Sequence, residues 1–160
     1  MFNFPASPST GQVFTPPGGL TYVWNGYAWA VSIITSPNSS AIIAVIDGSG
    51  ATITTGLKGY VEVPFNGAFS QVDMVADRSG NIVVDLWKCT FAQFDAGTTH
   101  PAAGDKITSS TPPTIIGGVK STDSVLASWT TVLTAGDIIG FYVTSVLNIQ
   151  RVTVTLRYNR

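Results

Sequence analysis

The chain has 160 residues, which is enough for one domain whose hydrophobic core needs neither a disulfide nor a metal to stabilise it. Charged residues make up only 11% of the composition, against roughly 25% in an average globular protein. With 8 basic and 9 acidic side chains, a net charge of -1 and no run of like charge, the sequence argues against partners such as nucleic acid or an anionic membrane.

Hydroxyl side chains take the place of charge, because the sequence contains 20 Thr and 15 Ser. Threonine is β-branched and serine competes with the helical backbone for hydrogen bonds, so this composition favours strands. The longest apolar run, residues 41–46, is far shorter than the roughly 18 residues that span a bilayer. Residues 1–5 lack the features of a signal peptide. We therefore expect a chain made in the cytoplasm that stays soluble or leaves the cell within an assembled particle.

Residues 1–36 form an uncharged, proline-rich lead segment, and residues 37–40 are expected to be a linker. Turn signals at residues 16–19 and at Asn25-Gly26 divide the lead segment into three short strands. A two-residue turn at Asn25-Gly26 would place Trp24 opposite Tyr27 and Tyr22 opposite Trp29, with all four rings on one face. Such a face is either a docking or sugar-binding platform or a small core in which the rings cover one another.

The remainder, residues 41–160, reads as many short strands with turns between them and no sustained helical period. The pattern predicts an all-β fold: an antiparallel β-sandwich of the jelly-roll type, preceded by the small β-meander. The last strand alternates most clearly, with Val152, Val154, Leu156 and Tyr158 buried and the residues between them exposed. The predicted strands cover residues 41–46, 50–55, 57–65, 69–76, 82–89, 105–108, 128–133, 137–144 and 149–158.

The sequence offers no set of residues for catalysis. A hydrolase or transferase needs a nucleophile and a base within hydrogen-bond reach, and His100 is the single histidine, in a loop with turn chemistry on both sides. Cys89 is interpreted as a small apolar filler of the core. No metal site and no cofactor are predicted, and we expect the protein not to be an enzyme.

Two aspartates form the one informative polar pair. If residues 69–76 and 82–89 are a hairpin with their apolar side chains buried, Asp73 lies opposite Asp85 on the outer face, with Trp87 beside them. Like charges opposite one another need an arginine of a neighbouring strand, a cation or a partner chain to neutralise them. Asp73, Asp85 and Trp87 are therefore a candidate glycan-binding surface, unless another sheet or subunit covers this face.

Several stretches resemble structural proteins of tailed bacteriophages. In the lead segment the resemblance rests on residues 4–8 (FPASP), 11–14 (GQVF), 19–22 (GLTY) and 24–29 (WNGYAW). In the remainder it rests on residues 56–65, 82–88, 135–137 and 151–154. The lead motif is the more specific of the two, and together they extend over most of the chain.

The resemblance implies a non-enzymatic component of the virion surface, such as a head decoration protein, a head fibre or a short tail fibre. It implies a homo-oligomer, a trimer by analogy, that contacts other virion proteins and host surface glycan. The lead segment would dock the protein on the particle through residues Phe4, Pro5, Phe14, Tyr22, Trp24, Tyr27 and Trp29. The alternative is a carbohydrate-binding or receptor-binding module that acts as an adhesin.

Overall fold

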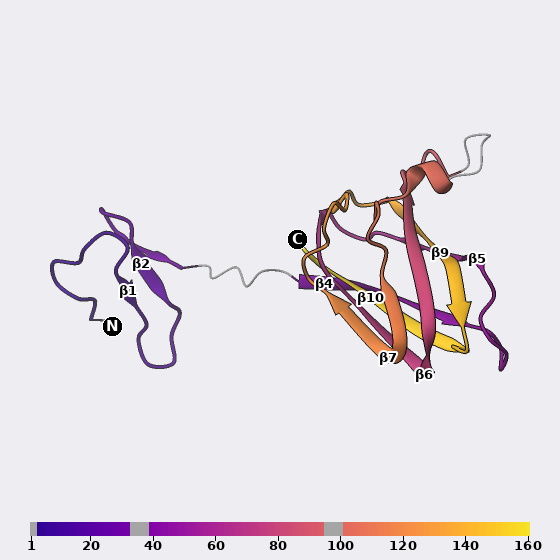
Figure 1. Ribbon diagram of the computed structural model, residues 1–160. Helices are drawn as coiled ribbons and strands as arrows, with labels where there is room; N and C mark the ends of the chain where they lie inside the picture. The colour runs from indigo at the N-terminus through magenta and orange to yellow at the C-terminus, as the bar shows by residue number, and fades with distance from the viewer. Residues whose placement is uncertain (1–2, 33–38, 95–100) are drawn as a thin grey trace. The chain divides into compact units, whose positions relative to one another are not determined.

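The computed structural model describes residues 3–32, 39–94 and 101–160 of the chain. The chain divides into two compact units, Met1–Ser36 and Pro37–Arg160. Each has its own sheet: a three-stranded one in the smaller unit and a seven-stranded one in the larger (Figure 1). Among the described residues, no helix is both long and apolar enough to cross a bilayer.

The smaller unit is an antiparallel meander of β1 (Val13–Phe14), β2 (Tyr22–Trp24) and β3 (Trp29–Val31). The predicted two-residue turn is wrong, because Trp24 pairs with Trp29 and Tyr22 pairs with Val31. The side chain of Asn25 explains the wider turn: its Oδ1 accepts hydrogen bonds from the backbone N–H of Tyr27 at 2.9 Å and from that of Ala28 at 2.8 Å. These two N–H groups therefore bond to a side chain within the connection between β2 and β3, and not to the backbone of the facing strand.

The larger unit confirms the predicted all-β, antiparallel sandwich. Its sheet runs in the order β4-β10-β6-β9-β5, and β7 and β8 also pair with β6. A short 3-10 helix, η1, precedes β7. The bounds are β4 (Ser39–Asp47), β5 (Gly56–Glu62), β6 (Gly67–Cys89), η1 (Ala103–Asp105), β7 (Thr114–Asp123), β8 (Val132–Leu133), β9 (Ile138–Leu147) and β10 (Arg151–Asn159).

β6 is one continuous strand of 23 residues, where the sequence predicted a hairpin with a turn at residues 77–81. The turn-forming side chains of that stretch satisfy backbone groups of neighbouring segments. Asp77 Oδ1 accepts hydrogen bonds from the backbone N–H of Gln150 at 3.1 Å and of Arg151 at 3.0 Å. Asn81 Oδ1 accepts one from the backbone N–H of Gly117 at 2.6 Å. The chain therefore continues as one strand through a stretch whose composition is typical of a turn.

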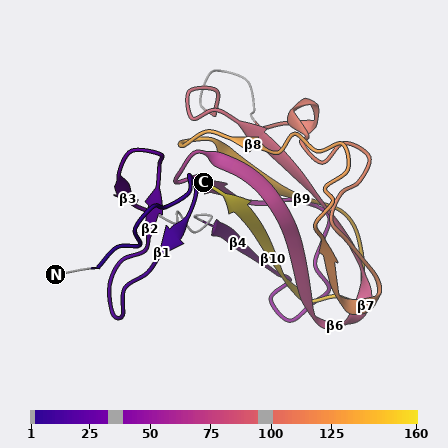
Figure 2. The ribbon, with the colours of Figure 1, turned by 90° about the vertical axis from the view of Figure 1, so that its left-hand side faces the viewer.

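The length of β6 creates the two layers of the sandwich. The first half of β6 pairs with β10, the second half pairs with β9, and β7 runs along the opposite edge. Because the strand curves, one sheet folds over and encloses its own apolar face (Figure 2). Both layers contribute side chains to the core. The layer of β4, β10 and the first half of β6 contributes Ile42, Ile46, Val72, Met74, Val152, Val154, Leu156 and Tyr158. The layer of β9 and the second half of β6 contributes Ile82, Val84, Leu86, Ile139, Phe141 and Val143.

Several predicted elements differ from the observed ones. Residues 50–55 form no strand, residues 105–108 contribute one isolated bridge at Lys106, and within residues 128–133 only β8 is a strand. Residues 39–40, expected in the linker, begin β4. β7 was not predicted, because it alternates weakly and only Ile115 of its apolar side chains is fully buried. The buried face of the last strand is confirmed, with all four predicted side chains inaccessible to solvent.

Candidate functional site

The aromatic side chains of the lead segment pack on one another. The ring of Phe4 lies 5.3 Å from that of Phe14, 5.1 Å from that of Tyr22 in an edge-on arrangement and 5.4 Å from that of Trp29, nearly parallel to it. Trp24 completes the cluster at 5.8 Å from Trp29. Ring pairs in this range of distances and angles are favourable beyond the area they bury. The structure therefore favours the small-core interpretation for these five rings.

One predicted ring stands apart from this aromatic core. Tyr27, at the tip of the connection between β2 and β3, is 92% exposed. Leu20 and Val13 are also more than half exposed, while Pro5 is half-buried. In the described part of this unit, the exposed large apolar side chains are Tyr27, Leu20, Val13 and Val31, the last of which is 47% exposed. Leu20 and Val13 were missed in the sequence, because the positions of the turns decide which side chains stay outside.

The predicted pair of Asp73 and Asp85 does not form. Both residues lie on β6, so a register between two separate strands does not apply to them. Asp73 pairs across the sheet with Thr155 and Thr122, and Asp85 pairs with Tyr142. At about 3.3 Å per residue they lie up to about 40 Å apart along the strand. A shared glycan or cation site between the two carboxylates is therefore ruled out.

Asp73 lies in a polar cluster on the outer face of β6, β7 and β10. Its Oδ1 accepts hydrogen bonds from Thr122 Oγ1 at 2.6 Å and Gln71 Nε2 at 2.7 Å, and its Oδ2 pairs with Arg157 Nε at 2.8 Å. These bonds, that from Thr122 foremost, lower the pKa of Asp73 from 3.8 to about 2. The neutraliser is thus an arginine of a neighbouring strand, one of the three expected options. A surface depression of about 700 Å³ surrounds the cluster.

The low pKa of Asp73 predicts a specific acid sensitivity. A carboxyl whose pKa is lower in the folded state stabilises the fold above its unfolded pKa, and this contribution is lost as the pH falls through the folded pKa. We expect the Asp73→Asn variant to lose less of its free energy of unfolding than the wild type between about pH 4 and pH 2. Urea unfolding at a series of pH values measures this. Parallel curves over that interval would contradict the assignment.

Asp85 is buried on the other half of β6 and is held by the segment that follows η1. Its Oδ1 accepts a hydrogen bond from Thr108 Oγ1 at 2.9 Å and pairs with Lys106 Nζ at 2.7 Å. Thr108 is fully buried and only 6% of Asp85 is exposed. The segment from Pro101 to Thr108 therefore covers this part of the outer face, where the sequence had offered another sheet or a subunit as the cover.

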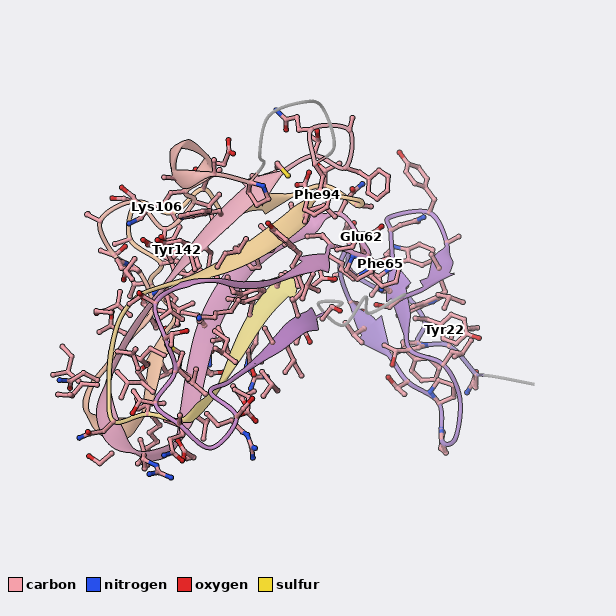
Figure 3. All side chains as sticks on the ribbon, turned by 90° about the vertical axis from the view of Figure 1, so that its right-hand side faces the viewer. Tyr22, Glu62, Phe65, Phe94, Lys106 and Tyr142 are labelled. Atoms are coloured by element: carbon pink, nitrogen blue, oxygen red, sulfur yellow. The ribbon has the colours of Figure 1, made fainter. Side chains whose placement is uncertain are left out.

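Trp87 lies beside Asp85, and its ring stacks on Tyr142 with 4.3 Å between centroids and 19° between planes. Asp85 joins this pair to the covering segment, because Tyr142 is its partner on the neighbouring strand and Lys106 is its ion-pair partner; Figure 3 labels both residues. One face of the Trp87 ring is therefore occupied by a neighbouring side chain, and the carboxylate next to it is paired. These contacts give Trp87 and Asp85 a packing role and leave no more than one face of the Trp87 ring for a sugar to stack on.

The other reactive side chains that the sequence singled out are Cys89 and His100. Cys89 is buried as expected, and burial is the main reason why the pKa of its thiol is raised, with negative Asp105 and Asp137 adding to the effect. Within residues 3–32, 39–94 and 101–160, no group of three or more histidine, cysteine or acidic side chains is placed to hold a metal ion. His100 lies outside the described residues.

No family model matches the chain, and no curated protein matches it significantly.

Proposed function

We propose that this protein is a non-enzymatic structural component on the surface of a tailed phage particle. In this proposal residues 1–36 dock the chain on other virion proteins, and the β-sandwich forms a homo-oligomer that is displayed outward. The protein would act as a capsid decoration, a head fibre or a small tail-fibre subunit, and would be located on the virion after synthesis in the host cytoplasm.

The observation that carries the proposal is the organisation of the lead segment. It is a compact unit of its own, contains no charged side chain, and uses five of its rings to build an internal core. The rings fix a scaffold that presents exposed Tyr27, Leu20 and Val13. A protein that docks permanently on another benefits from a rigid, uncharged contact surface, because no charge has to be desolvated and little side-chain entropy is lost.

Carbohydrate binding by the sandwich is the second candidate. The depression beside Asp73 favours it, because Gln71, Thr122, Thr155 and Arg157 line a hydrogen-bonding surface of the size of a sugar ring or larger. Trp87 is not part of this depression, and no other aromatic residue lines it. Binding would therefore lack a ring for the sugar to stack on, which makes it a weaker basis for sugar recognition.

Incorporation into particles tests the first proposal. Phage particles that lack the protein would be mixed with the full chain, with residues 37–160 alone, or with the Tyr27→Ala variant, and the protein bound to purified particles would be measured. We expect the truncated chain not to bind, and Tyr27→Ala to bind about tenfold less well, because an exposed aromatic ring is a frequent hot spot of interfaces.

The Tyr60→Ala variant is the matched control, since Tyr60 is an exposed tyrosine of the sandwich and should leave incorporation unchanged. Circular dichroism would establish that residues 37–160 remain folded. Normal incorporation of the truncated chain would overturn the docking role of the lead segment. The same truncated chain on a glycan array tests the second candidate, because sugar binding by the sandwich does not need residues 1–36.

A further inference from the structure

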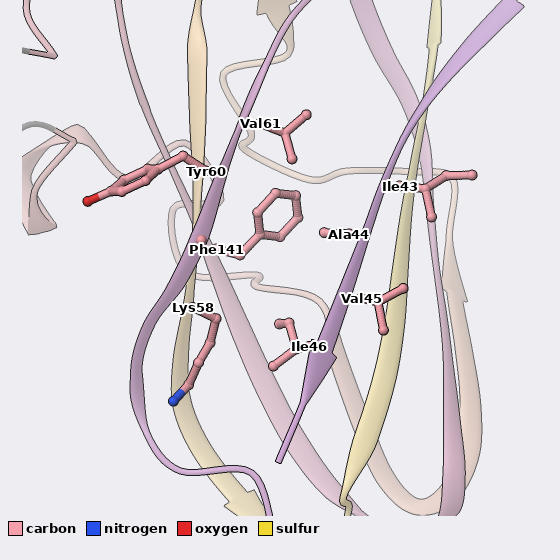
Figure 4. Close-up of a pocket in the computed structure, with 9 residues that line it drawn as sticks. Ile43, Ala44, Val45, Ile46, Lys58, Tyr60, Val61 and Phe141 are labelled. Carbon is pink, nitrogen blue, oxygen red and sulfur yellow. The ribbon is translucent and has the colours of Figure 1, made fainter. Parts of the chain in front are cut away.

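β4 is the end strand of the seven-stranded sheet and has a free edge. It pairs with β10 on one side, and within the described part of the chain no strand pairs with its other side. That edge faces β5, which is the other end strand, across an open cleft of about 230 Å³. Figure 4 shows the two strands diverging along the cleft, with Phe141 between them. Half of the backbone N–H and C=O groups of an edge strand point away from its sheet partner and are available to another strand.

The sequence of β4 lacks the bulges, prolines and lysines that usually protect such an edge. Residues 41–46 are all apolar, without charge, proline or glycine, and β4 pairs with β10 over nine residues without a register shift. On the sheet face away from the core, Ile43 and Val45 are 60% and 61% exposed. A long, regular and apolar edge of this kind pairs readily with a further strand.

The two other long edge strands of this sheet, β5 and β7, carry protective features. β5 carries a register shift between Leu57 and Gly59 with Lys58 inside it. β7 carries two register shifts, near Gly80 of its partner strand, and the exposed charge of Lys120. Bulges and edge lysines are the features that prevent unwanted strand pairing. The contrast indicates that the open edge of β4 is used by a partner.

We propose that β4 pairs antiparallel with β4 of a second copy of this chain, with Ile43 at the two-fold axis. In this register Ile42 lies opposite the partner's Ala44 on the core side of the sheet, and Ala41 lies opposite the partner's Val45 on the outer side. A large side chain then faces a small one in both rows, except at the axis, where Ile43 faces itself. Cross-strand pairs of this kind are the unit of sheet stabilisation.

Charge and register both support this choice. Asp47 falls opposite the partner's uncharged Ser39, and it is already paired within its own chain with Arg151 at 2.7 Å. A register centred on Ala44 would instead place Ile42 against the partner's Ile46 and Ala44 against itself, which leaves crowding beside a gap. Such an uneven row is unfavourable in a packed layer.

The inference rests on the homo-oligomer of the proposed function and specifies how its copies join. A two-fold contact uses the same edge in both copies and closes on itself, so it predicts a pair of sandwiches and not the trimer that the resemblance implies. The docking role of residues 1–36 does not depend on it. Failure of the β4 pairing would therefore leave the particle-incorporation experiment unaffected, and the two failures can be told apart.

Sedimentation equilibrium of the full chain at micromolar concentration tests the pairing. We expect a dimer for the wild type and a monomer for Ile43→Lys, because two lysines would meet at the axis and an edge lysine blocks strand addition. Ile116→Lys is the matched control: Ile116 is an 84% exposed isoleucine of β7, and this variant should remain dimeric. A monomeric or trimeric wild type, or equal effects of the two variants, would overturn the proposal.

Cross-linking gives a second readout that does not depend on dissociation. Opposite residues of an antiparallel pair have Cβ atoms about 5 Å apart, close enough for an introduced disulfide. Under mild oxidation the Ile43→Cys variant should form a covalent dimer, whereas Ile116→Cys should not. Native Cys89 is buried and should not compete. Failure of Ile43→Cys to cross-link above the level of Ile116→Cys would contradict the register.

Discussion

Replacing Gly80 with alanine is expected to destabilise the sandwich by about 3 kcal/mol, which is a large part of the stability of an ordinary domain. A Cβ at this position would lie 2.3 Å from the carbonyl oxygen of Leu147 and 2.9 Å from Cγ1 of Ile149. Both atoms belong to the segment around the connection from β9 to β10. That connection cannot retreat easily, because Asp77 holds the backbone N–H groups of Gln150 and Arg151.

Gly59→Ala is the matched control, because no atom lies within 4 Å of a Cβ built at Gly59 and the site needs no left-handed backbone. Chemical denaturation of the full chain measures both variants. We expect the unfolding midpoint of Gly59→Ala to stay close to that of the wild type and that of Gly80→Ala to fall sharply. Equal midpoints for the two variants would mean that the close approach of the β9–β10 connection to β6 is not rigid.

The position of Gly80 shows why the sequence predicted the fold class and not the path of the chain. Alternating apolar residues identify both halves of β6 and the face that each buries, and this local signal is sufficient for an all-β sandwich. Residues 77–81 also carry the local signal of a turn, but Asp77 and Asn81 bond to backbone from residues 150, 151 and 117. Such partners are distant in the sequence, so propensity at residues 77–81 alone could not reveal them.

The candidate site shows the same limit. The pairing of Asp73 with Asp85 was derived from the hairpin, so it failed when the hairpin was replaced by one strand. The sequence did predict that these carboxylates need a neutralising partner or a cover. In the structure Asp73 pairs with an arginine of a neighbouring strand, and Asp85 is covered. In the lead segment, the alternation of aromatic residues left a docking face and a small core both open, while the side chain of Asn25 holds the turn that leaves Tyr27 exposed.

Asp85→Ala is expected to have the second large effect on stability, again about 3 kcal/mol. Its removal leaves Lys106 Nζ without the carboxylate at 2.7 Å and the fully buried Thr108 Oγ1 without its acceptor at 2.9 Å. A buried polar group that has lost its partner costs more than the net value of the bond it made. The segment from Pro101 to Thr108, which contributes Ile107 to the core, should then separate from β6. Hydrogen exchange of the backbone N–H of Ile107, which bonds to the carbonyl of Leu86, would report this opening directly.

Asp73→Ala is the matched control, since it makes the same substitution on the same strand where the carboxylate is half-buried. The side chain of Arg157 is 56% exposed, so water can replace the lost partner, and the expected loss is about 1 to 2 kcal/mol, smaller than at Asp85. The double variant Asp85→Ala/Lys106→Met should recover part of the stability lost in Asp85→Ala, because it also removes the unpaired charge of Lys106. If Asp85→Ala and Asp73→Ala lower the free energy of unfolding equally, the ion pair at Asp85 does not hold the covering segment in place. Burial would then not be the property that separates the two carboxylates.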